Sequence, residues 1–332
     1  MSVAGRKTAF VTGGTGFLGL NLIEQLAEAG WAVTALHRPG SDLSGLKKFD
    51  VTPAKGQLIE LDALTDVVPE DLDAVFHVAG DTTMWSRHFA PQLRTNVDGT
   101  RNMVTAAHRR GARRFVHTSS IAAYGVWHGR EPISEDSEKK GDLSAVNYDR
   151  TKYHAEVVIQ GALRNGVDAV VLNPCHIIGR YDAHNWGRMI RMINEGTLPG
   201  VPPRAGTFCH AEAVAKAHIA AAERGRTGEN YLLGGPVADF LEVAQVIGRL
   251  TGKKVPRRPV PAWLFMLVAR AKTGWGNLRD REPDLTPQAA EVVLANARID
   301  TDKAERELGY VSPDLEAMLR DCYDWMKREK LV

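Results

Sequence analysis

A tyrosine and a lysine four residues apart are the clearest candidates for chemistry in this sequence. Tyr148 and Lys152 stand at i and i+4 of a segment with helical periodicity, so their side chains lie on one face of the helix. A free tyrosine has a pKa of about 10 and exchanges protons poorly at neutral pH. A neighbouring ammonium stabilises the phenolate and lowers that pKa. We therefore expect Tyr148 to act as a general acid or base with Lys152 beside it.

A serine at the end of a predicted strand completes this candidate catalytic set. The apolar run 114–118 predicts a buried strand, and Ser120 follows its carboxyl end, where open α/β sheets bind ligands. The serine hydroxyl would hydrogen-bond a substrate oxygen and polarise it. A tyrosine and a lysine at this spacing usually reflect packing and solvation, so the prediction depends on the elements that position them.

The first of these elements is a glycine-rich turn. Ala9–Val11 predicts a buried strand, glycines follow at every third position, and helical spacing of apolar residues continues to Leu26. Such a turn would place a pyrophosphate at a helix N-terminus, where free N–H groups and the helix dipole both favour an anion. The residues expected at this phosphate site are Gly13, Thr15, Gly16, Phe17, Leu18 and Gly19.

The end of the second predicted strand, 32–36, bears on the choice of cofactor. A carboxylate near this place accepts hydrogen bonds from the ribose of NAD, whereas an arginine accommodates the extra phosphate of NADP. Arg38 stands there beside His37, and no carboxylate does. We predict NADP(H) as the preferred cofactor; NAD(H), with Arg38 merely exposed on a loop, is the alternative.

Further cofactor contacts are expected after the next strands. A third strand over 57–61 would end at Asp62 and Ala63, which could lie along the adenine, although an aspartate there is also a common helix cap. Ala79 follows the fourth apolar run, and its small side chain would let a ribose approach the backbone. Asn96 is a poor helix former, so we expect its side chain to serve the sheet or the site.

Strand and helix patterns alternate six times up to residue 174, which predicts an α/β fold with a doubly wound parallel sheet. Residues 1–174 should form the NADP(H)-binding domain, with returning segments around 207–235. Residues 175–332 should form mainly a smaller domain that covers the substrate. Beyond residue 174 the patterns predict helices over 211–223, 239–251 and 313–328 and a strand over 231–233.

Composition limits the class of protein. The 332 residues carry a formal net charge of +2 without a sustained basic stripe, so nothing favours a nucleic-acid partner. Three cysteines show neither metal-ligand spacing nor a disulfide framework, so we expect no metal and a cytoplasmic location. The chain runs directly into its first strand, which argues against a secretory signal. The apolar stretch 261–269 is too short to span a bilayer, but a surface helix touching lipid or an apolar substrate stays an alternative.

Taken together, the motifs resemble those of extended short-chain dehydrogenases/reductases, in the superfamily of NAD-dependent epimerases and dehydratases. Within it the chain is similar to the dihydroflavonol-reductase-like and hydroxysteroid-dehydrogenase-like branch. The matching motifs are Thr12-Gly-Gly-Thr-Gly-Phe-Leu-Gly19, His77-Val-Ala-Gly80, Asn96-x-x-Gly99-Thr100-x-Asn102, Thr118-Ser-Ser120, Tyr148-x-x-x-Lys152 and Phe208-x-His210-x-x-x-Val214-Ala215.

This resemblance implies a Rossmann-like fold and hydride transfer. It assigns the glycine turn to the cofactor pyrophosphate, Arg38 to the NADP phosphate and Asp62 with Ala63 to the adenine. It also assigns Pro174 to the wall around the nicotinamide. Catalysis is assigned to Ser120, Tyr148 and Lys152. By analogy with similar proteins, the helices around 85–109 and 148–165 would form a homodimer.

Departures from the family pattern bear on the reaction. Dehydratases carry ionisable residues just after the serine, whereas Ile121-Ala122-Ala123 offers none. Sugar-nucleotide epimerases usually place an arginine where this chain has Gly206, although Arg204 stands nearby as a substitute. Asn173 occupies a position where some epimerases use an asparagine on the substrate, which favours them mildly.

We therefore predict an NADP(H)-dependent oxidoreductase that reduces a carbonyl or oxidises a secondary alcohol of a small, fairly apolar molecule. A nucleotide-sugar epimerase with tightly bound NAD is the alternative within enzymes. A non-catalytic NADP(H)-sensing protein is the alternative from another class, because this fold is sometimes kept for binding alone.

Overall fold

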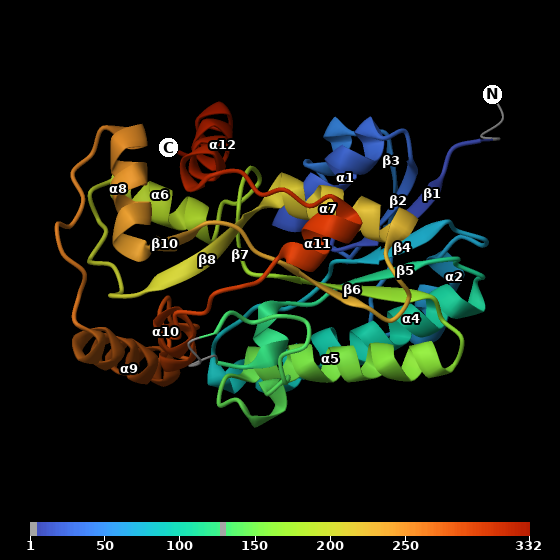
Figure 1. The fold of residues 1–332 in the computed structure, drawn as a ribbon, viewed down its shortest axis with the longest axis horizontal. Coiled ribbons are helices and arrows are strands. Elements are labelled where there is room, and N and C mark those ends of the chain that lie inside the picture. Colours follow the sequence, from blue (N-terminus) through green and yellow to red (C-terminus); the bar gives the residue numbers. More distant parts are fainter. Residues whose placement is uncertain (1–4, 127–130) are drawn as a thin grey trace.

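A parallel seven-stranded sheet occupies the centre of the computed structural model, which describes residues 5–126 and 131–332 (Figure 1). Its strand order is β3-β2-β1-β4-β5-β6-β9, and every neighbouring pair is parallel. The strands are β1 (Thr8–Thr12), β2 (Ala32–His37), β3 (Val51–Lys55), β4 (Ala74–His77), β5 (Phe115–Thr118), β6 (Ala169–Pro174) and β9 (Asn230–Leu233). The predicted doubly wound α/β fold is confirmed.

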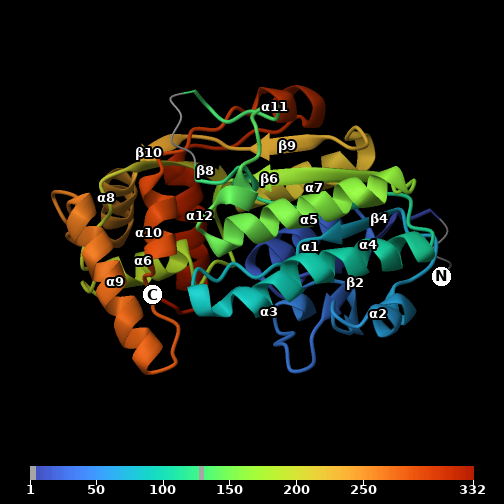
Figure 2. The ribbon, with the colours of Figure 1, turned by 90° about the horizontal axis from the view of Figure 1, so that it is seen from below.

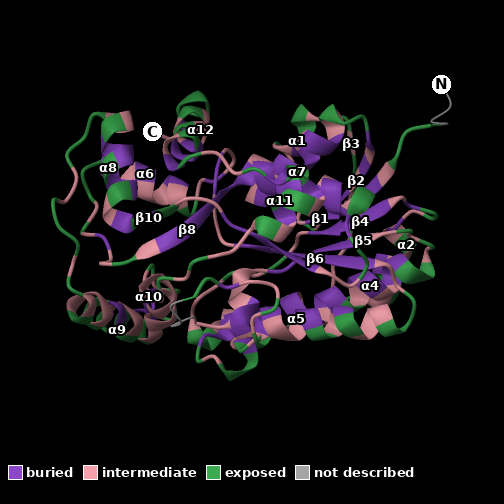
Figure 3. Cartoon of the chain, in the orientation of Figure 1, coloured by how far each residue is buried: buried purple, intermediate pink, exposed green. Residues whose placement is uncertain are grey.

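Helices cover both faces of this sheet, because parallel strands joined by crossover helices are buried on both sides (Figures 1 and 3). Ala9 and Val11 of β1 pack into one core, and Phe10 between them packs into the other. The helices over the first face are α1 (Phe17–Glu28), α7 (Ala211–Arg224) and α11 (Asp302–Leu308). Those over the second are α2 (Leu61–Val67), α4 (Gly99–Arg109) and α5 (Asn147–Arg164).

The third strand lies earlier in the chain than the sequence pattern predicted. We expected it over 57–61, but β3 pairs with β2 through residues 51–55. This strand is at the edge of the sheet and half-exposed, so it tolerates Pro53 and shows no run of apolar residues. The apolar residues that suggested a strand instead belong to the turn before α2, where Leu58 packs on the second core.

The chain beyond β6 builds a smaller body beside the carboxyl ends of the strands (Figure 1). A three-stranded sheet contains β7 (His176–Ile178), β8 (Ala205–His210) and β10 (Val237–Asp239). The helices here are α6 (Trp186–Asn194), α8 (Phe240–Thr251), α9 (Ala262–Leu278), α10 (Pro287–Leu294) and α12 (Leu315–Arg328). Phe208 and Phe240 lie in the core of this body. The intervening segment, α7 and β9, returns to the main sheet.

No helix among the described residues combines the length and the apolar character needed to cross a membrane.

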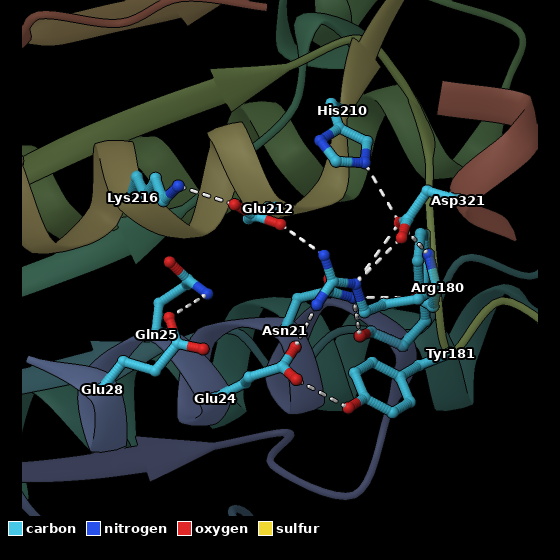
Figure 4. Close-up of polar contacts among 11 residues, drawn as sticks. Asn21, Glu24, Gln25, Glu28, Arg180, Tyr181, His210, Glu212, Lys216 and Asp321 are labelled. Carbon is cyan, nitrogen blue, oxygen red and sulfur yellow. Dashed lines mark hydrogen bonds and ion pairs between the residues drawn. The ribbon is translucent and has the colours of Figure 1, made fainter. Parts of the chain in front are cut away.

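One arginine ties the two bodies together (Figure 4). Arg180, just after β7, contacts Glu24 of α1 at 3.0 Å, Asp321 of α12 at 3.1 Å and Glu212 of α7. His210 also contacts Asp321, at 3.1 Å. Burial would raise the pKa of Asp321, but hydrogen bonds from His210 and Arg180 outweigh it and hold that pKa below its usual value. Three carboxylates from three helices therefore share one guanidinium.

Replacing Arg180 with methionine should lower the free energy of unfolding by about 3 kcal/mol at neutral pH, because it removes the cation shared by three largely buried carboxylates. Urea unfolding checks this. Arg101→Met is the matched control, since Arg101 pairs with Asp98 on an exposed helix surface and should cost no more than about 1 kcal/mol.

The cluster also gives this prediction a pH dependence. The depressed pKa values of Glu212 and Asp321 stabilise the fold where these carboxyls are ionised, so the difference between wild type and Arg180→Met should shrink as pH falls below about 4. Equal losses for Arg180→Met and Arg101→Met, or a difference independent of pH, would contradict this account of the cluster.

Candidate functional site

A cavity of about 930 Å³ opens at the carboxyl ends of the sheet strands. One wall comes from the segments that follow β1, β2, β3, β4, β5 and β6. The opposite wall comes from α6, β8 and residues 292–297 around the end of α10. Open α/β sheets bind their ligands at this edge.

The glycine turn lies at one end of the cavity, and two of its glycines are required sterically. Gly13 has φ +72°, and a Cβ there would lie 2.8 Å from the backbone N of Ala79. A Cβ on Gly19 would lie 2.0 Å from the carbonyl oxygen of Gly13. Helix α1 begins directly after the turn without a side-chain cap, so its first N–H groups are left for an anion. The predicted phosphate-site residues that line the cavity are Gly13, Thr15, Gly16, Phe17, Leu18 and Gly19.

The end of β2 adds a cationic corner to the same part of the cavity. His37, Arg38 and Ser41 line it, and the N–H of Ser41 donates to the carbonyl of Arg38 at 3.1 Å, closing a tight turn. The guanidinium of Arg38 is exposed and forms no ion pair with any residue that the structure describes. The nearby Asp42 is engaged by Ser44 instead.

The predicted adenine contact needs correction. Asp62 and Ala63 do not reach the cavity; the side chain of Asp62 is 99% exposed on α2. Gln57, Leu58 and Ile59 line that wall in their place. The error follows from the misplaced third strand, because a strand that ends at residue 55 brings the following turn to the cavity.

Ala79, after β4, lines the cavity as predicted, but Asn96 does not. The Asn96 side chain is buried in a single π-helical turn, Arg94–Asp98. Its Oδ1 accepts from the N–H of Asp81 at 2.7 Å, and its Nδ2 donates to the Asp81 carbonyl and to Thr151 Oγ1. Asn96 thus holds the loop after β4 against α5 and acts on the cavity only through that loop.

The three predicted catalytic residues meet on one wall of the cavity, with Pro174 nearby. Helix α5 presents Tyr148 and Lys152 on the same face, and Ser120 stands at the end of β5. The Lys152 Nζ donates to the carbonyl of Thr118 at 2.9 Å and lies 5.8 Å from the centre of the Tyr148 ring. Ser120 Oγ accepts from the N–H of Ala122 at 3.2 Å, which fixes the serine side chain.

Burial sets the protonation of this pair. From the sequence we expected Lys152 to lower the pKa of Tyr148, but burial raises it, and a hydrogen bond with Ser120 only partly opposes that change. Burial lowers the pKa of Lys152 to about 8, and the carboxylate of Glu156 works in the opposite direction. At neutral pH the site therefore holds a protonated phenol beside an ammonium, which is the arrangement of a proton donor.

Glu156, one helical turn beyond Lys152, was missed by the sequence analysis. Its buried carboxylate accepts from Ser119 Oγ at 2.5 Å, from Asn173 Nδ2 at 2.6 Å and from Asn230 Nδ2 at 3.1 Å, and it pairs with Lys139. The Asn173 side chain is hydrogen-bonded within this network and does not line the cavity. Its position therefore gives no support to the epimerase alternative. Tyr148, Lys152 and Glu156 follow one another at intervals of four residues, and this spacing was the sequence signal that could have identified Glu156.

The far half of the cavity combines large apolar side chains with polar ones such as Thr83, Asn185 and Asn296. Its described walls include Met84, Ile133, Ile177, Trp186 and Val292. Lys152 and Arg38 are the only lysine and arginine among the described residues that line the whole cavity, and Arg204 is absent from its walls.

Gly206 faces a histidine where an epimerase would have its arginine. A Cβ on Gly206 would lie 2.9 Å from Cδ2 of His176, so a side chain there requires His176 to move. Burial lowers the pKa of His176 to about 4, which leaves the imidazole neutral at physiological pH. The far half of the cavity thus offers no described cation to a diphosphate.

Comparison with known proteins agrees with this geometry. The chain matches the NAD dependent epimerase/dehydratase family over residues 9–234. It is 29% identical to a Synechocystis protein assigned as a dihydroflavonol 4-reductase, covering 97% of this chain and 95% of the relative. It is also 29% identical to the sterol demethylase protein B of Methylococcus capsulatus, covering 98% and 100%. The crystal structure of gox2253 superposes with a TM-score of 0.84 at 27% identity, covering 98% and 99%.

A family match over two thirds of the chain, together with full-length relatives and a shared fold, settles the class. The chain therefore belongs to the NAD-dependent epimerase/dehydratase family, the extended short-chain dehydrogenases/reductases, and is a nicotinamide-dependent enzyme.

Proposed function

We propose that this enzyme is an NADP(H)-dependent reductase that interconverts a carbonyl and a secondary alcohol on a small, fairly apolar molecule. The observation that carries the proposal is the meeting of Ser120, Tyr148 and Lys152 at the junction between the two halves of the cavity. One half contains the glycine turn and Arg38, which suit phosphate, and the other has no described lysine or arginine beyond Lys152 itself.

The residues present fit a dinucleotide. The turn at Gly13 and Gly19 leaves no room for side chains, and the first N–H groups of α1 have no side-chain cap. Both features suit a pyrophosphate, which needs close approach of the backbone and unpaired donors. The bound nicotinamide supplies or accepts the hydride.

The chain's own residues would handle the oxygen and its proton. In the direction of reduction, Ser120 donates a hydrogen bond to the carbonyl oxygen and polarises it. As the carbonyl carbon gains the hydride, the Tyr148 hydroxyl passes its proton to that oxygen. The ammonium of Lys152 then stabilises the phenolate that remains. In oxidation the same phenolate accepts the alcohol proton.

The corner at the end of β2 supports NADP(H) over NAD(H). Arg38 lacks an ion-pair partner among the described residues, and Ser41 stands beside it in the cavity wall. An unpaired guanidinium with a neighbouring hydroxyl suits a phosphate monoester. The carboxylates that line the described cavity are Asp81, on the segment after β4, and Asp149, on α5. Neither lies at the end of β2, where a carboxylate would favour NAD(H).

The far half of the cavity supports an apolar substrate over a nucleotide sugar. A sugar diphosphate needs cationic partners in that half, and Gly206 with its neighbour His176 offers none. The name of the M. capsulatus relative refers to sterols, which are apolar alcohols.

Tyr148→Phe should lower kcat for carbonyl reduction by about 10²- to 10⁴-fold, because the proton donor is lost while the ring is kept. The assay follows NADPH consumption on a panel of ketones and aldehydes. Tyr153→Phe, on the same helix but outside the cavity walls, is the matched control and should keep full activity. Unchanged turnover in Tyr148→Phe would refute its role, and epimerisation of a UDP-sugar without turnover of any carbonyl would refute the proposed function.

The pH profile of reduction should report Lys152. Its charged form is present below the folded pKa, so kcat/KM for NADPH should be level at lower pH and decline as pH rises through about 8. Tyr148 stays protonated in this range because burial raises its pKa. In Lys152→Arg the cation persists to higher pH, so the decline should disappear even if the rate is lower. A decline at the same pH in both proteins would assign it to another group.

Arg38→Ala should raise the Kd for NADPH by about 10- to 100-fold, the range expected for one charge-assisted hydrogen bond. The Kd for NADH should change by less than about 2-fold, because the lost contact is to the additional phosphate. Calorimetric titration of both cofactors measures this, with Arg101→Ala as a surface control. Equal weakening of both cofactors would rule out Arg38 as the phosphate ligand.

A further inference from the structure

Helix α9 exposes several large apolar side chains to solvent, although Leu264, Phe265 and Met266 on the same helix are half-buried. Trp263 is 70% exposed and Leu278 is 80% exposed, and Leu267, Val268 and Trp275 are also exposed. Their spacing places them along one side of the helix. Of the whole of α9, only Ala269 and Gly276 are buried. We call the five exposed side chains the α9 stripe.

Cationic side chains flank the α9 stripe. Arg270 and Arg279 are exposed and, on a helical wheel, stand at its two edges. The Arg279 guanidinium lies 4.1 Å from the centre of the Trp275 ring. Residues 253–284 contain eight lysines and arginines against two aspartates and one glutamate, whereas the chain as a whole has 42 against 40. Asp284 pairs with Lys272 at 2.9 Å, which leaves Arg270 and Arg279 as the cations beside the stripe. The positive charge is therefore local to this helix and the loops beside it.

The helix that carries the stripe is tied to the substrate half of the cavity. Figure 2 shows α9 at the edge of the molecule beside α10, whose residue Val292 lines the cavity. Asn277 of α9 accepts a hydrogen bond from Trp85 Nε1 at 2.8 Å. Thr286, just before α10, donates to the carbonyl of Met84, another lining residue, at 2.6 Å. The pair α9 and α10 thus forms an outer support of the cavity wall.

We propose that α9 is a docking helix that lies on a membrane surface containing anionic phospholipids. Tryptophans favour the boundary between headgroups and acyl chains, leucines enter the acyl region, and arginines pair with anionic headgroups. With no described helix able to cross a bilayer, the protein would rest on the surface. Pairing α9 with a second copy would bring the same cations face to face, so charge favours an anionic partner.

Docking in this way would bring the apolar half of the cavity next to the phase in which apolar molecules concentrate. This last step rests on the proposed function, because it identifies the membrane as the source of the substrate. The docking itself depends only on the α9 stripe and its arginines.

Sedimentation of the full-length protein with vesicles tests the docking. Wild type should bind vesicles of phosphatidylcholine with phosphatidylglycerol more tightly than vesicles of phosphatidylcholine alone, and salt should weaken that binding.

The double variant Trp263→Ser/Leu278→Ser should bind at least about tenfold more weakly, because two inserted apolar side chains are lost. Arg270→Gln should weaken binding to vesicles that contain phosphatidylglycerol and leave binding to vesicles of phosphatidylcholine unchanged. Val311→Ser, a 78% exposed position outside α9, is the matched control and should bind as wild type does.

Two further readouts keep the outcomes distinct. Turnover of a water-soluble ketone without vesicles should be the same in wild type and double variant, since neither residue lines the cavity. If wild type reduces ketones but binds no vesicles, the docking proposal fails and the proposed function stands. If light scattering shows a wild-type dimer that the double variant dissociates, and vesicles are not bound, the stripe is a self-association surface and the proposal is wrong. Vesicle binding by a protein without reductase activity would support docking and refute the function.

Discussion

The site depends on a buried ammonium. Lys152 loses its hydration inside the cavity wall, and burial alone would favour its neutral form. The Thr118 carbonyl at 2.9 Å and the negative charge of Glu156 oppose that loss. Glu156 is itself buried, which is tolerable only because its two oxygens are filled by Ser119, Asn173, Asn230 and Lys139. The charge of Lys152 beside Tyr148 is therefore supported, through Glu156, by hydrogen-bond donors from the ends of β5 and β6, from β9 and from the segment before α5.

The partners of Glu156 come from several strands, so the network forms only where the fold brings those strands together. Strands β5, β6 and β9 are neighbours in the sheet, so Ser119, Asn173 and Asn230 converge although they are far apart in the sequence. Helix α5 lies across them and brings Lys152 and Glu156 down on one face. At the other end of the same edge, the glycine turn holds β4 and α1 so closely that Gly13 and Gly19 cannot carry side chains.

The sequence was informative where a local pattern determines the structure. Buried parallel strands are continuous apolar runs, the glycine turn is contiguous, and Tyr148 and Lys152 share one helix, so each could be predicted. The edge strand at 51–55 escaped prediction because it is half-exposed and carries Pro53. The error at Asp62 followed from that strand. The roles of Asn96 and Asn173 depend on partners 15 to 57 residues away and had no local pattern. Glu156 continues the four-residue spacing of Tyr148 and Lys152, but its partners lie as far as 74 residues away and could not be predicted. The 261–269 run was ambiguous because an apolar helix has the same composition whether its apolar side faces a core or solvent.

In the function that we propose, this cavity holds NADP(H) with its nicotinamide against Tyr148 and its extra phosphate at Arg38. A crystal structure of the protein with NADP⁺ tests it most directly. The account predicts the pyrophosphate at Gly13–Gly19, the adenosine phosphate within hydrogen-bond distance of Arg38, and the nicotinamide ring opposite Ser120 and Tyr148. A cofactor whose adenosine phosphate points away from Arg38, or whose nicotinamide lies outside the reach of Tyr148 and Lys152, would contradict it.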